Sequence, residues 1–130
     1  MDYGTKNVGL ACSDVLAVTV RPLPSVPNLG RKSLLVRLEA AIRENQIDKL
    51  VVGVPWNMDG TSGEGVKRIL SFIDLLRKEL DIPVQGVDER LSSVEASSVW
   101  NEMTKRQRKR YRTMDSLAAA IILQRFIEEY

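Results

Sequence analysis

The chain has 130 residues, of which 44% are hydrophobic and 28% are charged, and its formal net charge is +2 at pH 7. This balance excludes a disordered chain and predicts that residues 1–130 form a single globular domain. The absence of histidine excludes Ser-His-Asp and Cys-His catalysis and the usual zinc sites, and the single cysteine, Cys12, excludes an internal disulfide. No apolar run approaches the roughly 20 residues that span a bilayer, and no signal peptide is recognised. We therefore expect a cytoplasmic protein that does not associate with membranes.

The first part of the chain is predicted to form three strands. Asp2–Gly4 looks like the end of a strand, and Val8–Ser13 alternates as a second strand with Cys12 in the core. Leu16–Val20 contains the β-branched residues that favour a third strand. The prolines and glycine between positions 22 and 30 predict an irregular link.

The remainder of the chain is predicted to alternate helices and strands. The expected elements are a helix over Lys32–Asn45, a strand over Leu50–Val54, a helix over Val66–Leu80, a strand over Val84–Val87, a helical stretch near Val94–Met103 and a final helix over Thr113–Tyr130. Three strands joined by short turns, followed by this alternation, are typical of a mixed sheet with helices on both faces.

Acidic residues fall at the ends of three predicted elements. Asp2 stands near the first strand, and Gly4 after it has no side chain to keep a phosphate from the backbone. Asp88 and Glu89 directly follow the fifth strand, at the edge where open α/β sheets bind ligands. Asp115 heads a stripe of the last helix that has the spacing of a face packed on a sheet, with Ala118, Ala119, Ile122 and Phe126.

Each acidic residue also has a simpler interpretation. Asp2 could cap a hairpin turn, Glu89 could pair with Arg90, and Asp115 could be the N-cap of its helix. If the sheet brings these positions together, however, they form an all-oxygen site, which suits Mg²⁺ or Mn²⁺ rather than zinc. Two such ions roughly 4 Å apart can activate water and stabilise the leaving oxygen in phosphodiester hydrolysis.

Four segments resemble, in their order and spacing, the motifs of a known family. They are DYGTKNVGLACSD, VVGVPWNMDGTSG, VDERLSS and MDSLAAAIILQRF, and they are spread over essentially the whole chain. The chain thereby resembles the YqgF family, bacterial ribonuclease-H-like nucleases described as Holliday-junction resolvases and as nucleases that mature the 5′ end of pre-16S ribosomal RNA. The resemblance implies a ribonuclease-H-like five-stranded mixed sheet of strand order 3-2-1-4-5 with helices on both faces.

The resemblance also implies a divalent-metal-dependent nuclease. Carried over by position, the catalytic acids would be Asp2, Asp88, Glu89 and Asp115, and Mg²⁺ or Mn²⁺ would be held by Asp2, Glu89 and Asp115. Of the neighbouring pair we favour Glu89. The leading function is processing of pre-16S rRNA in ribosome biogenesis, with ribosomal precursor particles as further partners. Resolution of a four-way DNA junction is the alternative, and we expect a monomer or a weak dimer.

Two positions depart from the family's pattern. Met1 directly precedes Asp2, where the family usually has several apolar residues, so either the central strand is short or the true start lies upstream. Asn7 stands where the family commonly has arginine, and Lys6 could replace only part of that phosphate contact.

Basic and aromatic residues predict contacts with nucleic acid. A basic segment shortly before Asp115 could hold phosphates near the acids or could be a solvated surface, and it contains Lys105, Arg106, Arg108, Lys109, Arg110 and Arg112. Trp56 could stack on an unpaired base, although closing the edge of the core is the commoner role for such a ring. We also expect contacts from Lys6, Asn7, Asn57 and Arg90.

Two other functional classes share parts of this pattern. DYGTKNVG also resembles the phosphate loop of actin-like sugar kinases and chaperone ATPases, but those proteins need two such domains to close over ATP. The second alternative is a non-catalytic RNA- or ribosome-binding module, which the absence of metal-dependent cleavage would favour.

Overall fold

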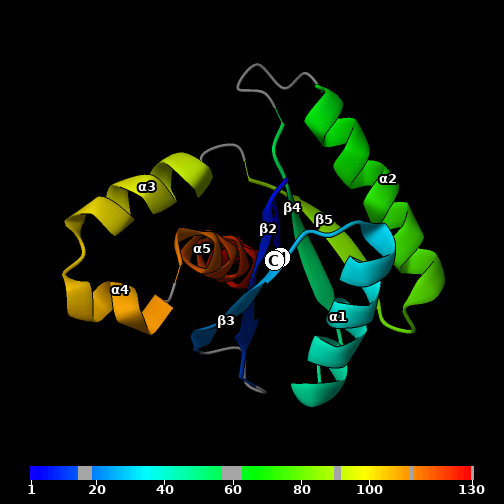
Figure 1. Ribbon diagram of the computed structural model, residues 1–130, viewed down its shortest axis with the longest axis horizontal. Helices are drawn as coiled ribbons and strands as arrows, with labels where there is room; N and C mark the ends of the chain where they lie inside the picture. Colours follow the sequence, from blue (N-terminus) through cyan, green and yellow to red (C-terminus); the bar gives the residue numbers. More distant parts are fainter. Residues whose placement is uncertain (15–18, 57–62, 90–91, 112, 130) are drawn as a thin grey trace.

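The structure is a computed structural model that describes residues 1–14, 19–56, 63–89, 92–111 and 113–129. Its elements in chain order are β1 (Asp2–Tyr3), β2 (Asn7–Ser13), β3 (Val20–Pro27), α1 (Arg31–Glu44), β4 (Leu50–Val54), α2 (Glu64–Glu79), β5 (Val84–Asp88), α3 (Ser92–Glu102), α4 (Lys105–Tyr111) and α5 (Met114–Glu129). Helices α1 and α2 lie on one side of the strands and α5 on the other, with α3 and α4 outside α5 (Figure 1). The prediction of a mixed α/β fold with helices on both faces is confirmed.

The strands form two hydrogen-bonded sheets, so the prediction of one continuous five-stranded sheet of order 3-2-1-4-5 is wrong. The first sheet has the antiparallel order β1-β2-β3, and the second pairs β4 with β5 in parallel. The sheets meet at Met1, whose α-amino nitrogen donates to the Val51 carbonyl (2.7 Å) and whose carbonyl accepts from the Gly53 N–H (3.0 Å). Because β1 comprises only Asp2 and Tyr3, this contact lies beside β4 without extending into a ladder.

The prolines that were expected to break the chain instead lie within β3. Most of the strand predicted at 16–20 falls on residues outside the described part, and the observed strand begins at Val20 and ends at Pro27. Pro22 faces Ala11 of β2, and β3 is an edge strand. A proline has no N–H, and at an edge that missing donor can face outward without removing a ladder bond.

The other predicted elements are confirmed within a few residues as α1, β4, α2, β5, α3 and α5. Strand residues alternate between two faces, and the face toward α1 and α2 forms the main core, which includes Val8, Leu10, Leu34, Val52, Phe72, Ile73 and Leu76. On the other face, Val51 and Val87 pack against Ile122 of α5. Cys12 is buried, as predicted. None of the helices in the described ranges is both long and apolar enough to cross a membrane.

Helix α4 was not predicted, although the sequence contains a signal for it. The Gln107 N–H donates to the Thr104 hydroxyl (3.2 Å), and the Thr104 N–H donates to the Gln107 side-chain oxygen (2.9 Å). This reciprocal pair is a capping box, which satisfies backbone donors at the start of a helix. The spacing of Thr104 and Gln107 therefore indicates that the basic segment begins a helix of its own.

The start of α5 lies very close to β2. A Cβ atom built on Gly9 would overlap the backbone carbonyl group of Asp115 and come within 3.1 Å of its Cβ. Gly9 is paired with Asp2 in the sheet, so the glycine allows the first turn of α5 to approach the strand that carries Asp2. This contact positions the site described below.

We predict that Gly9→Ala destabilises the protein by about 1–3 kcal/mol, because the added methyl group forces α5 away from β2. The measurement is the midpoint of urea unfolding. The matched control is Gly65→Ala in α2, where a Cβ meets nothing within 4 Å and should be neutral or stabilising. An unchanged midpoint for Gly9→Ala would contradict this close packing.

Candidate active site

Three of the four predicted acids come together where β1, the end of β5 and the start of α5 meet. Asp2 in β1 faces Gly9, and the first turn of α5, which contains Asp115, lies over the same glycine. Glu89 directly follows β5, and its N–H donates to the Val54 carbonyl (3.1 Å). The carboxyl groups of Asp2 and Glu89 hydrogen-bond to each other, and the charge of Asp115 also acts on Asp2.

Glu89 is the most unusual of these acids because its side chain is buried. The residue is only 4% exposed, and its Oε2 atom has no hydrogen-bond partner among the described residues. The carboxyl group lies against Gly53 of β4, where an added Cβ would come within 2.7 Å of both Glu89 Oε2 and Ile122 Cδ1. Gly53 therefore makes room for the carboxyl group between the sheet and α5.

Burial also changes the protonation of the pair. Loss of solvent raises the pKa of Glu89 from its ordinary 4.5 to about 8, and the negative charge of Asp2 adds to the shift. Burial likewise raises the pKa of Asp2, although the α-amino group of Met1 opposes that shift and Asp115 adds to it. The pair therefore favours keeping one proton at neutral pH, and we assign it to Glu89, whose carboxyl group would then donate to the Asp2 carboxylate.

Asp88 lies on the other side of the strands, although its charge also adds to the raised pKa of Glu89. It is the exposed last residue of β5, and it lines a pocket on the α2 side together with Trp56 and Arg77. Successive strand residues point to opposite faces, so Asp88 and Glu89 diverge. The geometry thus separates two acids that the sequence left together, and it groups Glu89 with Asp2.

The simpler interpretation of Asp115 as the N-cap of its helix is wrong. The cap is Thr113, whose hydroxyl oxygen accepts the Ser116 N–H (3.1 Å). The Ser116 hydroxyl in turn donates to the Leu23 carbonyl (2.9 Å), which ties α5 to β3. Asp115 lies in the first turn, where the positive end of the helix favours a negative charge.

The turn between β1 and β2 is held by a residue other than Asp2. Asn28 donates its side-chain amide to the Gly4 carbonyl (2.8 Å), and its backbone N–H donates to the Lys6 carbonyl (2.8 Å). Lys6 and Asn7, both predicted to contact nucleic acid, are exposed at this turn. The turn therefore presents a cation close in sequence to Asp2.

The acids fit a divalent ion in donor chemistry, although they are not gathered into a finished site. Across the described ranges, no three Asp, Glu, His or Cys side chains are grouped so as to hold a metal ion. The Asp2 and Glu89 carboxyl groups nevertheless lie together, the charge of Asp115 acts on Asp2, and Glu89 has a buried oxygen with no hydrogen-bond partner in the described chain. Oxygen donors of this kind suit Mg²⁺ or Mn²⁺, which would replace the proton shared by Asp2 and Glu89.

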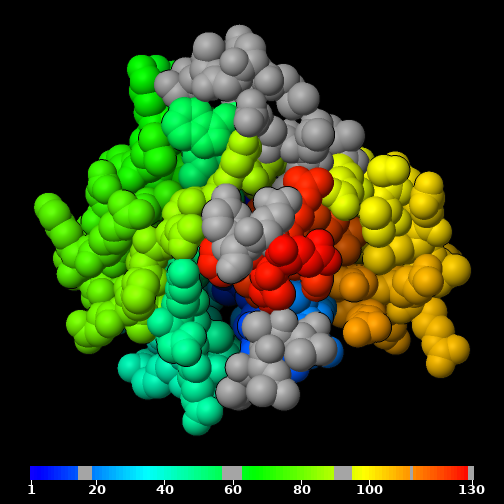
Figure 2. Space-filling view, turned by 180° about the vertical axis from the view of Figure 1, so that it is seen from behind, coloured from blue at the N-terminus to red at the C-terminus, as the bar shows by residue number. Residues whose placement is uncertain are grey.

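The basic helix α4 leads into the turn that carries Asp115. The Thr113 N–H donates to the carbonyl of Tyr111, the last residue of α4 (2.7 Å). Most of the predicted phosphate-binding residues are exposed on this helix, namely Lys105, Arg106, Lys109 and Arg110. The helix lies on the opposite flank of α5 from α2 (Figure 2).

Arg108 differs from its neighbours on α4. It is half-buried, its Nε donates to the Trp100 carbonyl (2.9 Å), and its guanidinium lies 5.1 Å from the centre of the Trp100 ring. Arg108 therefore holds α4 against α3 rather than facing solvent. Asn57, Arg90 and Arg112 lie outside the described residues, so their predicted contacts stay predictions. Trp56 is half-buried and packs on the main core, as a ring at its edge would.

A family model described as "RuvX: Holliday junction resolvase" matches residues 1–129. The chain belongs to the RuvX family. This match confirms the resemblance to YqgF, which is the same family, and it decides against the kinase and chaperone ATPase alternative.

Curated relatives match the chain along nearly its whole length. A protein of Clostridioides difficile named "Putative pre-16S rRNA nuclease" is 37% identical over 128 residues, which is 98% of this chain and 91% of the relative. One of the same name from Lachnospira eligens is 38% identical and covers 98% of this chain and 94% of the relative.

A solved structure supports the fold. The Fowlpox virus resolvase, crystallised with Holliday junction DNA, aligns with a TM-score of 0.55 at 14% identity, over 98% of this chain and 93% of the viral one. At this identity the likeness shows a common fold, which the RuvX-family chain builds with the two-sheet arrangement described above.

We predict that Glu89→Gln is more stable than the wild type at pH 8 and that this advantage shrinks toward pH 5, in buffer without divalent ions. The unfolded chain releases the Glu89 proton near pH 4.5, whereas the native state holds it up to about pH 8. Ionisation therefore favours unfolding as the pH rises between these values, and glutamine removes that penalty.

Urea unfolding of both proteins at several pH values measures this difference. Glu39→Gln on the exposed face of α1 controls for the loss of a carboxylate elsewhere. A stability difference between Glu89→Gln and the wild type that does not change with pH would contradict the proton assigned to Glu89.

Proposed function

We propose that this RuvX-family protein is a divalent-metal-dependent nuclease that hydrolyses phosphodiester bonds while processing the 5′ end of pre-16S rRNA in ribosome biogenesis. The observation that carries the proposal is the buried Asp2–Glu89 pair beside Asp115, in which one Glu89 oxygen has no hydrogen-bond partner among the described residues. The names of the curated relatives support RNA as the substrate. A cytoplasmic location remains part of the proposal.

Asp2, Glu89 and Asp115 are the residues that would hold the ion. A bound Mg²⁺ or Mn²⁺ would supply an activated water and charge stabilisation for the leaving oxygen. Glu89 must lose its proton first, because a carboxylate binds a cation only when ionised. Gly53 and Gly9 keep Glu89 and Asp115 close to Asp2, and Lys6 could bind a phosphate oxygen on the exposed side. Asp88 points to the other face, so we assign it no role at the ion.

Resolution of four-way DNA junctions is the second candidate function. It is favoured by the description of the family and by the fold shared with a resolvase solved on junction DNA. A junction has two strands to cut, which a dimer suits, whereas an RNA end needs one site. We therefore expect the RNA-processing protein to act as a monomer or weak dimer, on naked RNA or on ribosomal precursor particles.

We predict that cleavage of a pre-16S leader requires Mg²⁺ or Mn²⁺ and falls by about 10²–10⁴-fold in Glu89→Gln and in Asp115→Asn, because each variant lacks a charged ligand. Rates on the leader and on a four-way DNA junction are compared under single-turnover conditions. Glu39→Gln on α1 is the matched control and should cleave normally. Cleavage of the junction alone would favour resolution, and cleavage of neither would favour a non-catalytic RNA-binding module.

The exposed residues of α4 give a separate prediction. Replacing Arg106 and Lys109 with glutamine should weaken RNA binding across sequences and reduce the slope of log affinity against log salt by roughly 0.7 for each phosphate that is no longer neutralised. The control is Arg37→Gln with Arg43→Gln on α1, which removes the same charge from the opposite side of the strands. Equal salt slopes for the two double variants would mean that α4 does not touch the nucleic acid.

A further inference from the structure

A concave surface opens at the same end of the strands as the candidate active site, but on the α2 side. It is a pocket of about 430 Å³ between the ends of β4 and β5 and the middle of α2. The described residues that line it are Val54, Trp56, Leu70, Ile73, Asp74, Arg77, Gly86, Val87 and Asp88. None of the three acids grouped at the candidate active site is among them.

The pocket and the candidate active site share one backbone carbonyl. The Val54 carbonyl accepts the N–H of Trp56 (3.0 Å) and also the N–H of Glu89 (3.1 Å). Asp88, which lines the pocket, pairs with Val54 in the sheet and directly precedes Glu89. A strand of nucleic acid that passes over this end of the sheet from the α5 side to the α2 side would reach the pocket directly after Glu89.

The walls of the pocket are apolar and aromatic. Trp56 is half-buried, with its inner part packed on the main core, so the ring has little freedom to move. Leu70 on α2 is 38% exposed, which is unusual for a leucine beside a core, and Ile73 lies one turn further along. A flat apolar group inserted here would cover Leu70 and stack on the indole, an interaction that any base can make.

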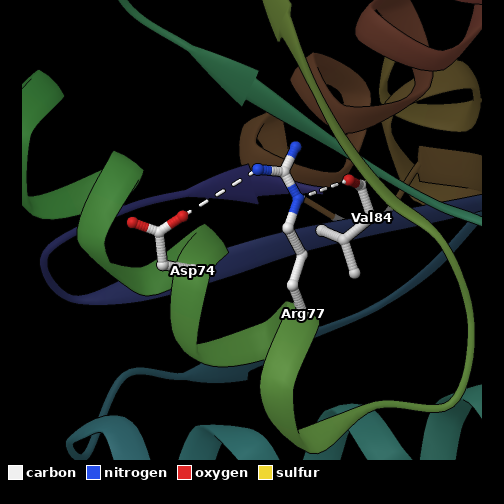
Figure 3. A network of polar contacts seen from close by, with 3 residues as sticks. All are labelled: Asp74, Arg77 and Val84. Carbon is white, nitrogen blue, oxygen red and sulfur yellow. Dashed lines mark hydrogen bonds and ion pairs between the residues drawn. The ribbon is translucent and has the colours of Figure 1, made fainter.

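The rim of the pocket is polar and held in place. The Arg77 Nε donates to the Val84 carbonyl (3.0 Å), and an Arg77 terminal nitrogen lies 3.9 Å from an Asp74 oxygen, as Figure 3 shows. The side chains of Arg77 and Asp74 are still 54% and 75% exposed, so both can accept a further partner. The pocket thus presents one fixed guanidinium and the carboxylates of Asp74 and Asp88.

The charged groups at the rim of the pocket determine which kind of ligand it can bind. Two carboxylates disfavour a phosphate, whereas they suit a base that has N–H donors on its pairing edge. Guanine has two adjacent donors, N1–H and the exocyclic amino group, and its O6 and N7 atoms accept from an arginine. Such an edge is available to a protein only when the base is unpaired.

We propose that this pocket binds an unpaired guanine of the nucleic-acid substrate, next to the phosphate that lies at the acids. The proposal rests on the proposed nuclease function for its substrate and extends that function to a preference in sequence. Trp56 and Leu70 provide the stacking surface, and Arg77 and Asp74 read the edge of the base.

Tryptophan fluorescence tests the pocket without requiring cleavage. The chain has two tryptophans, so Trp100→Phe leaves Trp56 as the reporter. In EDTA, this protein is titrated with five-residue oligouridylates that carry a central guanosine, adenosine or abasic site. The guanosine oligomer should quench Trp56 and bind most tightly, and Trp56→Leu should lower its affinity about 5- to 150-fold, followed by anisotropy of a labelled oligomer.

The abasic oligomer and a conservative variant make the result specific. Trp56→Leu should not change the affinity of the abasic oligomer, and Trp56→Phe, which keeps a ring, should retain most of the preference for guanosine. Leu70→Ser at the exposed rim gives a second route if Trp56→Leu does not fold, because it removes apolar surface without adding a charge, and it should also weaken only the guanosine oligomer. Equal losses of affinity for the guanosine and abasic oligomers, or no quenching of Trp56 fluorescence, would overturn the proposal that the pocket binds guanine.

The experiments distinguish failure of the guanine-pocket proposal from failure of the proposed nuclease function. Cleavage that depends on Glu89 but not on Trp56 or on the neighbouring base would overturn the guanine-pocket proposal and support the nuclease function. Guanosine-dependent quenching in a protein that cleaves nothing would keep the pocket as a binding site and overturn the nuclease.

Discussion

The buried carboxyl pair of Asp2 and Glu89 is the interaction on which the rest of this account depends. Removing an ionised carboxyl group from water is costly, and a protein avoids that cost by keeping a proton on one member of the pair. Here we assign the proton to Glu89, whose pKa is raised to about 8, and one of the Glu89 carboxyl oxygens has no hydrogen-bond partner in the described chain. A fold that needed only stability would place an apolar residue there. This cost is the reason why we propose that the pair receives a cation.

Two glycines and a helix cap make this arrangement possible. Gly53 leaves space for the Glu89 carboxyl group against β4, and Gly9 lets the first turn of α5 lie on β2. Because Thr113 caps α5, the carboxylate of Asp115 is not required for that purpose. The acids therefore meet through close backbone approaches between elements far apart in sequence, and a methyl group added at either glycine would disrupt the approach at that point.

Much of the fold could be predicted from the sequence, because local patterns decide it. Apolar periodicity located α1, α2 and α5, and a continuous apolar run located β4. The prolines of β3 were misread because a proline is tolerated at a sheet edge, and an edge is a property of the whole sheet rather than of the segment. The prediction of one continuous sheet was wrong because pairing between strands is also a property of the whole fold. In the described residues, two backbone hydrogen bonds of Met1 connect the two sheets.

The site was predictable in its residue types but not in its details. The positions of Asp2, Glu89 and Asp115 followed from element ends and a helical stripe. The divergence of Asp88 from Glu89 depends on the exact residue at which β5 ends, which a pattern locates only within a residue or two. Gly9 and Gly53 were missed, although a glycine inside a strand is a signal of close approach. The contact of Arg108 with Trp100 was also missed, because nothing local to Arg108 indicates Trp100 as its partner.

The most direct test of the account is the number of protons released when a divalent ion binds. A weakly buffered solution at pH 7 is titrated with Mn²⁺ while base is added to hold the pH constant. Because Glu89 is protonated at this pH and must ionise to bind the ion, the wild type should release close to one proton per ion bound, and Glu89→Gln should release almost none. Binding without proton release in the wild type, or equal release by Glu89→Gln, would contradict the account.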